Sequence, residues 1–166
     1  MFGHLLIVLA GSGLGFYYAQ RLTRRVTYLH QCVRLLRAVG QQVAFTALPM
    51  TDLWLRLASR EVFADYALLQ ETASRLPVAD FHTAFTEAVE AAVRRGELES
   101  SGRQLLLEFA EGCGRYDLTG QTAHITQYGD RLETLEQETA QKAAPLCRVY
   151  QMTGVAGGTA LALLLM

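Results

Sequence analysis

The sequence predicts an all-α protein in which a helical bundle is flanked by one transmembrane helix at each end. Three observations lead to this fold class. Apolar residues in the middle of the chain recur every three or four positions, the period of an amphipathic helix. No stretch between turn signals alternates with period two, so strands are not expected. All charged side chains lie between Arg21 and Arg148, and both ends are uncharged and largely apolar.

The first uncharged run, residues 2–20, is predicted to be a transmembrane helix. At about 1.5 Å per residue it spans about 28 Å, close to a hydrocarbon core of about 30 Å. A cleaved signal peptide is the alternative, but such a peptide carries basic residues before its apolar core. Here, Arg21, Arg24 and Arg25 follow the apolar run and none precedes it.

The second uncharged run, residues 149–166, is predicted to be a shorter transmembrane helix. Its strongly apolar part begins at Met152 and spans about 22 Å, a length that bilayer thinning or helix packing can accommodate. Lys142 and Arg148 precede it, and positive flanks stay on the cytoplasmic side. Residues 21–148 are therefore expected in the cytoplasm and both termini outside, in the cell membrane. Three scattered cysteines agree with a reducing compartment.

The middle segment, residues 21–148, is long enough for one compact domain and carries the signals of about six helices. The first has apolar residues at a/d spacing, interrupted only by Gly40: Val26, Leu29, Val33, Leu36 and Val43. A short second helix should be capped by Thr51. A third, residues 62–76, should end before Pro77.

The remaining helices follow from capping residues and from a heptad pattern. Asp80 is predicted to cap the fourth helix and Gly96 to end it. A fifth begins at Ser100 or Ser101. The last and longest, residues 118–149, keeps a seven-residue register, with a kink expected at its proline near the membrane. The first and last helices should therefore form an antiparallel stalk that continues into the two spans.

No residue pattern predicts catalysis, a cofactor or a metal. Four histidines show neither HExxH spacing nor a cysteine partner and are expected to be structural: His4, His30, His82 and His124. The chain has no CxxC pair, no GxSxG elbow and no Walker lysine. We therefore expect a non-enzymatic protein. A net charge of −1 gives no bulk attraction to nucleic acid.

Four glycines are candidates for helix packing in the membrane. Gly11 and Gly15 have GxxxG spacing in the first span, and Gly154 and Gly158 repeat it in the second. Small residues four positions apart let helix backbones approach closely in lipid. The contact is expected with the other span or with a partner membrane protein, and incidental glycine content is the alternative.

Two groups of polar residues are candidates for partner binding. Asp117 and Gln121 belong to a predicted helix-to-helix corner, where Asp117 can cap the next helix and Gln121 lies one turn later. A purely structural corner is the alternative. Arg24 and Arg25 begin the predicted domain and are the second candidate group. Their default role is to fix the topology, and they can also contact anionic lipid of the bilayer.

Several motifs in this order resemble the stage III sporulation protein AB family, bacterial membrane proteins similar to the F-type platform proteins of type II secretion and type IV pilus systems. The motifs are Gly15-Phe16 closing the first span, Gln42-Val43-x-Phe45-x-x-x-Pro49-Met50, Gly114-x-x-Asp117-x-x-x-Gln121, and Tyr150-x-x-x-Gly154-x-x-x-Gly158. Gln42 stands where the family pattern has an acid, and Cys113 stands where a leucine is usual.

The resemblance implies a component of a secretion-like channel between mother cell and forespore in endospore formation. By analogy with platform proteins, the cytoplasmic domain is expected to dock a secretion-type ATPase that resembles stage III sporulation protein AA. Other membrane channel components and further copies of the chain are expected neighbours. The alternative is a regulatory or receptor-like membrane protein whose helical bundle senses a ligand. A membrane enzyme is a third reading, disfavoured by the charge-free spans.

Overall fold

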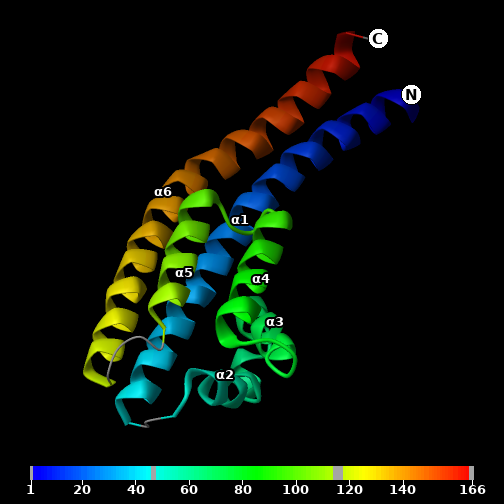
Figure 1. The fold of residues 1–166 in the computed structure, drawn as a ribbon. Coiled ribbons are helices and arrows are strands. Elements are labelled where there is room, and N and C mark those ends of the chain that lie inside the picture. The colour runs from blue at the N-terminus through cyan, green and yellow to red at the C-terminus, as the bar shows by residue number, and fades with distance from the viewer. Residues whose placement is uncertain (1, 46–47, 114–117, 165–166) are drawn as a thin grey trace. The chain divides into compact units, whose positions relative to one another are not determined.

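The computed structural model describes residues 2–45, 48–113 and 118–164, and no residue in these ranges is in a β-strand. Within these ranges the regular elements are six α-helices and one short 3-10 helix, namely α1 (Phe2–Phe45), α2 (Met50–Ala58), η1 (Glu61–Phe63), α3 (Ala67–Arg75), α4 (Phe81–Arg94), α5 (Ser100–Gly112) and α6 (Leu118–Leu164) (Figure 1). The predicted all-α fold is confirmed.

The chain forms two compact units. Met1–Val26 and Gln137–Met166 make up one, here called the terminal unit, and Thr27–Glu136 makes up the other, here called the core unit. Helices α1 and α6 each contribute to both. The predicted boundaries at residues 20 and 148 mark the ends of membrane spans, whereas these two units are defined by contacts within the protein. Those boundaries therefore stay predictions.

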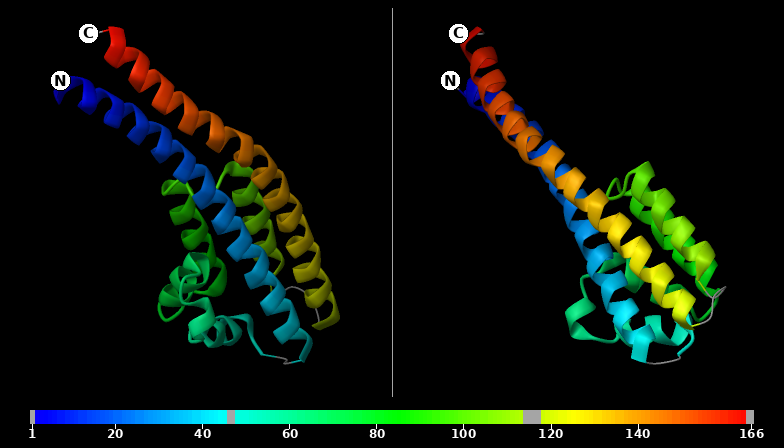
Figure 2. Two further views of the ribbon diagram at one scale, coloured as in Figure 1. Left: turned by 180° about the vertical axis from the view of Figure 1, so that it is seen from behind. Right: turned by 90° about the vertical axis from the view of Figure 1, so that its left-hand side faces the viewer.

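In the terminal unit the first part of α1 and the last part of α6 run side by side and antiparallel, as Figures 1 and 2 show from different sides. Ala19 and Ala143 are buried there, and the Cys147 thiol donates to the carbonyl oxygen of Ala19 at 3.5 Å. In the described parts of the chain, we find no helix with the length and apolar character needed to cross a membrane. The spans at residues 2–20 and 149–166 stay predictions.

The core unit has a continuous apolar interior to which all of its helices contribute. At its centre, the rings of Trp54 and Phe85 lie 5.7 Å apart and those of Phe85 and Phe109 lie 5.8 Å apart, and all three are fully buried. Leu36 of α1 and Leu132 of α6 are equally buried, so the long helices close the core around α2–α5. Burying each of these side chains contributes about 2 kcal/mol to the stability of the fold.

Helix ends that depend on local signals lie where the sequence predicts them. The Asp80 carboxylate accepts the Thr83 N–H at 3.0 Å and caps α4. After α4, Gly96 has a φ of 72°, a conformation that favours glycine and ends the helix. Helix α5 begins at Ser100, also as predicted.

Two predictions of helix extent are wrong. Thr51 does not cap α2, because the Pro49 carbonyl already accepts the Leu53 N–H at 3.0 Å and the helix begins at Met50. The predicted helix over residues 62–76 is divided into η1 and α3. Gln70 donates from its side-chain amide to the carbonyls of Ala58 and Phe63, which stabilises the intervening turn.

Both long helices are continuous, and the kink expected at Pro145 stays a prediction. Gly40 lies within α1 and does not break it. Pro145 lies within α6, which continues to Leu164. A proline removes one backbone hydrogen bond, and the rest of a long helix can tolerate that loss.

Candidate functional site

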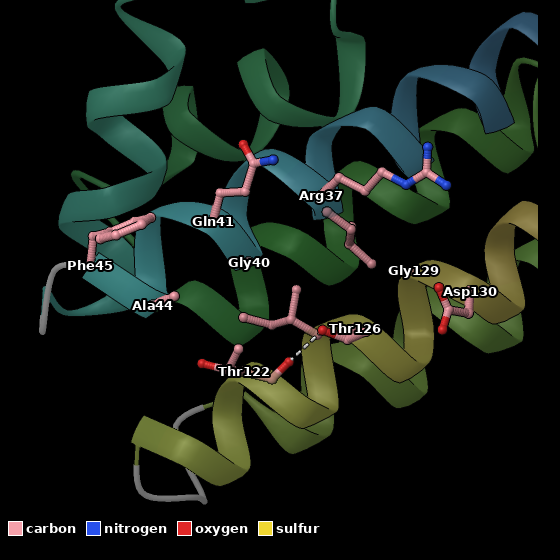
Figure 3. A pocket seen from close by; sticks show the side chains of 11 residues that line it. Arg37, Gly40, Gln41, Ala44, Phe45, Thr122, Thr126, Gly129 and Asp130 are labelled. Carbon is pink, nitrogen blue, oxygen red and sulfur yellow. Dashed lines mark hydrogen bonds between the residues drawn. The ribbon is translucent and has the colours of Figure 1, made fainter.

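A groove in the core unit lies between the C-terminal part of α1 and the N-terminal part of α6 (Figure 3). We call it the α1–α6 groove; its volume is about 410 Å³. It is lined by Leu36, Arg37, Gly40, Gln41, Ala44, Phe45, Thr122, Ile125, Thr126, Gly129 and Asp130. Most of these side chains are apolar or small, so the groove suits an apolar surface better than a charged one.

Two glycines explain where the helices touch and where the groove between them is open. At Gly40 a β-carbon would lie 3.3 Å from Cγ2 of Ile125, so α1 and α6 approach closely there. At Gly129 a β-carbon would meet nothing within 4 Å. The helices therefore touch at the Ile125 level, and the space over Gly129 is left unfilled.

The groove continues along α6 into a second, more open hollow of about 760 Å³. The two share four lining residues, namely Ala44, Thr122, Thr126 and Asp130. The Thr126 hydroxyl donates to the carbonyl oxygen of Thr122 at 2.9 Å, as the dashed line in Figure 3 shows. Because that hydroxyl already has a hydrogen-bond acceptor within its own helix, an apolar partner that covers it would not leave the donor unpaired.

Two polar contacts connect the two helices beside the groove. Arg37 of α1 forms an ion pair with Glu133 of α6, and Nδ1 of His30 lies within hydrogen-bond distance of Glu136 Oε1, at 2.8 Å. These groups are partly exposed, so each pair contributes less than about 1 kcal/mol. Asp130 lines the edge of the groove with an exposed side chain. At the end of α1, the Phe45 side chain is 89% exposed.

The start of α6 is positioned by His124. Its ring stacks on Phe109 at 5.7 Å, and its Nε2 lies 3.0 Å from the Phe109 carbonyl oxygen. A β-carbon on Gly112 would lie only 2.1 Å from Cε1 of this ring, so α5 must end in glycine to admit it. The structural role predicted for His124 is confirmed.

The partner-binding residues named from sequence do not lie in one unit. Arg24 is exposed and Arg25 half-buried on α1, and both belong to the terminal unit. Gln121 is half-buried in the first turn of α6 and belongs to the core unit, next to the groove residue Thr122. Asp117 lies outside the described residues.

The four glycines named for membrane packing are also only partly described. Gly11 and Gly15 lie in α1, and Gly154 and Gly158 lie in α6. The structure does not describe what surrounds these glycines, so their packing stays a prediction.

Sequence reasoning missed the α1–α6 groove. The available signal was spacing, because Gly40 and Ala44 are four residues apart on α1, and Thr122, Thr126 and Gly129 follow one face of α6. That spacing indicates that each helix has a small-residue face. It does not indicate that the two faces meet.

Two kinds of group that can carry chemistry are metal ligands and cysteine thiols. Across the described ranges, no three His, Cys, Asp or Glu residues converge to hold a metal ion. Burial raises the pKa of the Cys32 thiol, and it raises that of Cys113 to about 12. Both thiols therefore stay protonated at neutral pH, and the thiolate is the reactive form.

Comparison with known proteins identifies the family. No curated protein and no solved structure matches the chain significantly. The family model of stage III sporulation protein AB matches residues 1–166, the whole chain. The protein therefore belongs to the stage III sporulation protein AB family.

Proposed function

We propose that this sporulation protein is a non-enzymatic platform of a secretion-like channel, and that its core unit docks a secretion-type ATPase at the α1–α6 groove. The docking site is inferred from one observation, the unfilled and mainly apolar groove beside the exposed Phe45. Exposed apolar surface of this kind is typical of an interaction site. The partner, similar to stage III sporulation protein AA, hydrolyses the ATP.

The charge of the core unit supports a basic partner surface. Residues 27–136 contain fifteen acidic and ten basic side chains, a net charge of −5. The exposed Asp130 carboxylate at the edge of the groove offers one contact for a lysine or arginine of the ATPase. Complementary charge steers association and fixes register more than it sets affinity. Gln121 and the neighbouring Asp117 are further predicted contacts.

The location in the cell membrane is part of the same proposal. Residues 2–20 and 149–166 cross the membrane, and the core unit faces the cytoplasm, on the mother-cell side where the host forms spores. Fusions of an alkaline phosphatase to the C-terminus test this arrangement, because that reporter is active only outside the cytoplasm. An inactive fusion to the full chain, with a cytoplasmic reporter active at the same position, contradicts the orientation.

The docking test uses the purified full-length chain and the secretion-type ATPase of the same organism. Gly129→Leu places a side chain in the groove, where an added β-carbon meets nothing within 4 Å, and circular dichroism should show that the variant keeps the wild-type helix content. We expect its affinity for the ATPase to fall at least about tenfold, the loss caused by about 1.4 kcal/mol. Thr134→Leu is the matched control, because it adds a leucine to an exposed position of α6 outside the groove.

Each outcome of this titration has a defined meaning. Unchanged affinity of Gly129→Leu excludes the groove as the docking site. An equal loss in Thr134→Leu places the contact elsewhere on α6. Complete absence of binding by the folded wild-type chain refutes the docking proposal itself.

The receptor-like alternative is supported by one feature, the volume of the groove. At about 410 Å³ it falls within the range of small-molecule sites. Such a protein binds its ligand without an ATPase, so a small apolar molecule that raises the unfolding temperature of wild type but not of Gly129→Leu favours that reading.

A further inference from the structure

Charge is divided unequally between the two units. Sequence positions 1–26 and 137–166, which form the terminal unit, include five basic residues and one acidic residue, a net charge of +4. The core unit has a net charge of −5. The nearly neutral chain therefore combines a basic unit with an acidic one.

The basic unit also exposes aromatic side chains. Phe16, Tyr17 and Tyr18 are 61%, 61% and 48% exposed, whereas Ala19 is only 4% exposed. Successive helix positions are 100° apart, so α1 turns one small residue towards α6 and aromatic rings towards its surroundings. Tyrosine is enriched at the membrane–water interface, because its ring is apolar and its hydroxyl group remains hydrated.

Two arginines follow on the same face of α1 as one of these rings. Tyr17, Arg21 and Arg24 occupy positions i, i+4 and i+7, which lie above one another on a helix. Arg21 and Arg24 are exposed, and neither pairs with an acidic side chain among the described residues. We call these three residues the Tyr-Arg strip.

We propose that the Tyr-Arg strip binds the phosphate groups of anionic phospholipids. Arginine presents several N–H donors in a planar fork that matches phosphate oxygens, and its charge is permanent. The ring of Tyr17 lies at headgroup depth while the two guanidinium groups contact phosphates of the same leaflet. The inference rests on the membrane location proposed above and adds a lipid selectivity to it.

The test measures lipid preference with the full-length chain in detergent. Equal amounts of phosphatidylglycerol and phosphatidylcholine with identical acyl chains are added, and native mass spectrometry counts the lipids that remain bound. Wild type should retain phosphatidylglycerol preferentially. Each arginine near an anionic surface contributes about a fivefold preference, so Arg21→Gln with Arg24→Gln should reduce it by up to about 30-fold.

A matched control removes the same charge elsewhere. Arg56→Gln with Arg60→Gln also neutralises two exposed arginines, but both belong to the core unit. This variant should keep the wild-type preference. Circular dichroism of both double variants should show unchanged helix content, because the substituted side chains are exposed and glutamine favours helix.

Two results overturn the inference. One is an unchanged preference for phosphatidylglycerol in the Arg21→Gln, Arg24→Gln variant. The other is an equal loss in both double variants, which would show that net charge alone attracts the lipid. Failure of the proposed function is seen separately, as release of the chain from cell membranes by alkaline carbonate or as absent ATPase binding, and neither readout depends on lipid headgroup type.

Discussion

Two glycines, Gly112 at the end of α5 and Gly129 within α6, should respond oppositely to the same substitution. Gly112 closes α5, and an added β-carbon there would lie 2.1 Å from Cε1 and 2.3 Å from Nε2 of His124. Gly129 lies inside α6, and an added β-carbon there would meet nothing within 4 Å. Gly112→Ala should therefore destabilise the protein, and Gly129→Ala should stabilise it.

The magnitudes follow from the contacts of each glycine. At Gly112 the imidazole ring must move, which adds about 1–3 kcal/mol of overpacking and loses the bond to the Phe109 carbonyl, about 1 kcal/mol. Alanine's higher helix propensity returns at most about 1 kcal/mol. The net loss for Gly112→Ala is about 2 kcal/mol. Gly129→Ala has only the propensity term and should gain about 0.8–1 kcal/mol.

Urea unfolding of the purified full-length chain, followed by circular dichroism, measures both changes. The His124→Ala background isolates the cause, because without the ring the Gly112→Ala penalty should disappear. If Gly112→Ala costs as much in that background as in wild type, the contact with His124 is not its cause. If Gly129→Ala destabilises the protein, the space beside Gly129 is filled by a group whose contacts the substitution disturbs.

Two further predictions concern titratable groups. The Asp80 carboxylate accepts hydrogen bonds from the N–H and the hydroxyl of Thr83, at 3.0 Å and 2.8 Å. These bonds favour the charged form and lower the pKa of the Asp80 carboxyl below 3.8. The stability that the carboxylate contributes is therefore fully present above pH 3.8 and is lost as the pH falls through the lower pKa of the folded state. In acid unfolding experiments Asp80→Ala should flatten the fall in stability below about pH 4, and an unchanged profile would contradict the capping role. Iodoacetamide at pH 8 should modify Cys147 before Cys32, because Cys32 is fully buried with a raised pKa whereas Cys147 is half-buried. Peptide mass spectrometry after timed quenching measures the order, and equal rates would mean that the core unit opens readily.

The sequence was sufficient wherever a few neighbouring residues determine the structure. Helix α4 illustrates this, because Asp80 supplies its cap three residues from the N–H it accepts and Gly96 supplies the positive φ that ends it. The start of α2 was missed, since proline and threonine are both suitable before a helix and the position of the first backbone hydrogen bond decides between them.

The sequence was insufficient wherever a distant residue decides. The break between η1 and α3 depends on Gln70, whose side chain reaches the carbonyl of Ala58 twelve residues earlier. The α1–α6 groove depends on Gly40 lying against Ile125. A spacing rule describes each helix separately and carries no information about which faces meet.

The polar contacts between α1 and α6 have a consequence for how the chain folds. Arg37 and Glu133 are 96 residues apart in sequence, and His30 and Glu136 are 106 apart. At a ribosomal rate of about 10 residues per second, α1 waits about 10 s for the helix that covers it. The connections among α2, α3, α4 and α5 are short, so this group can assemble first. During that interval the apolar side of α1 is an exposed target for chaperones, and arrival of α6 is the step that completes the native topology.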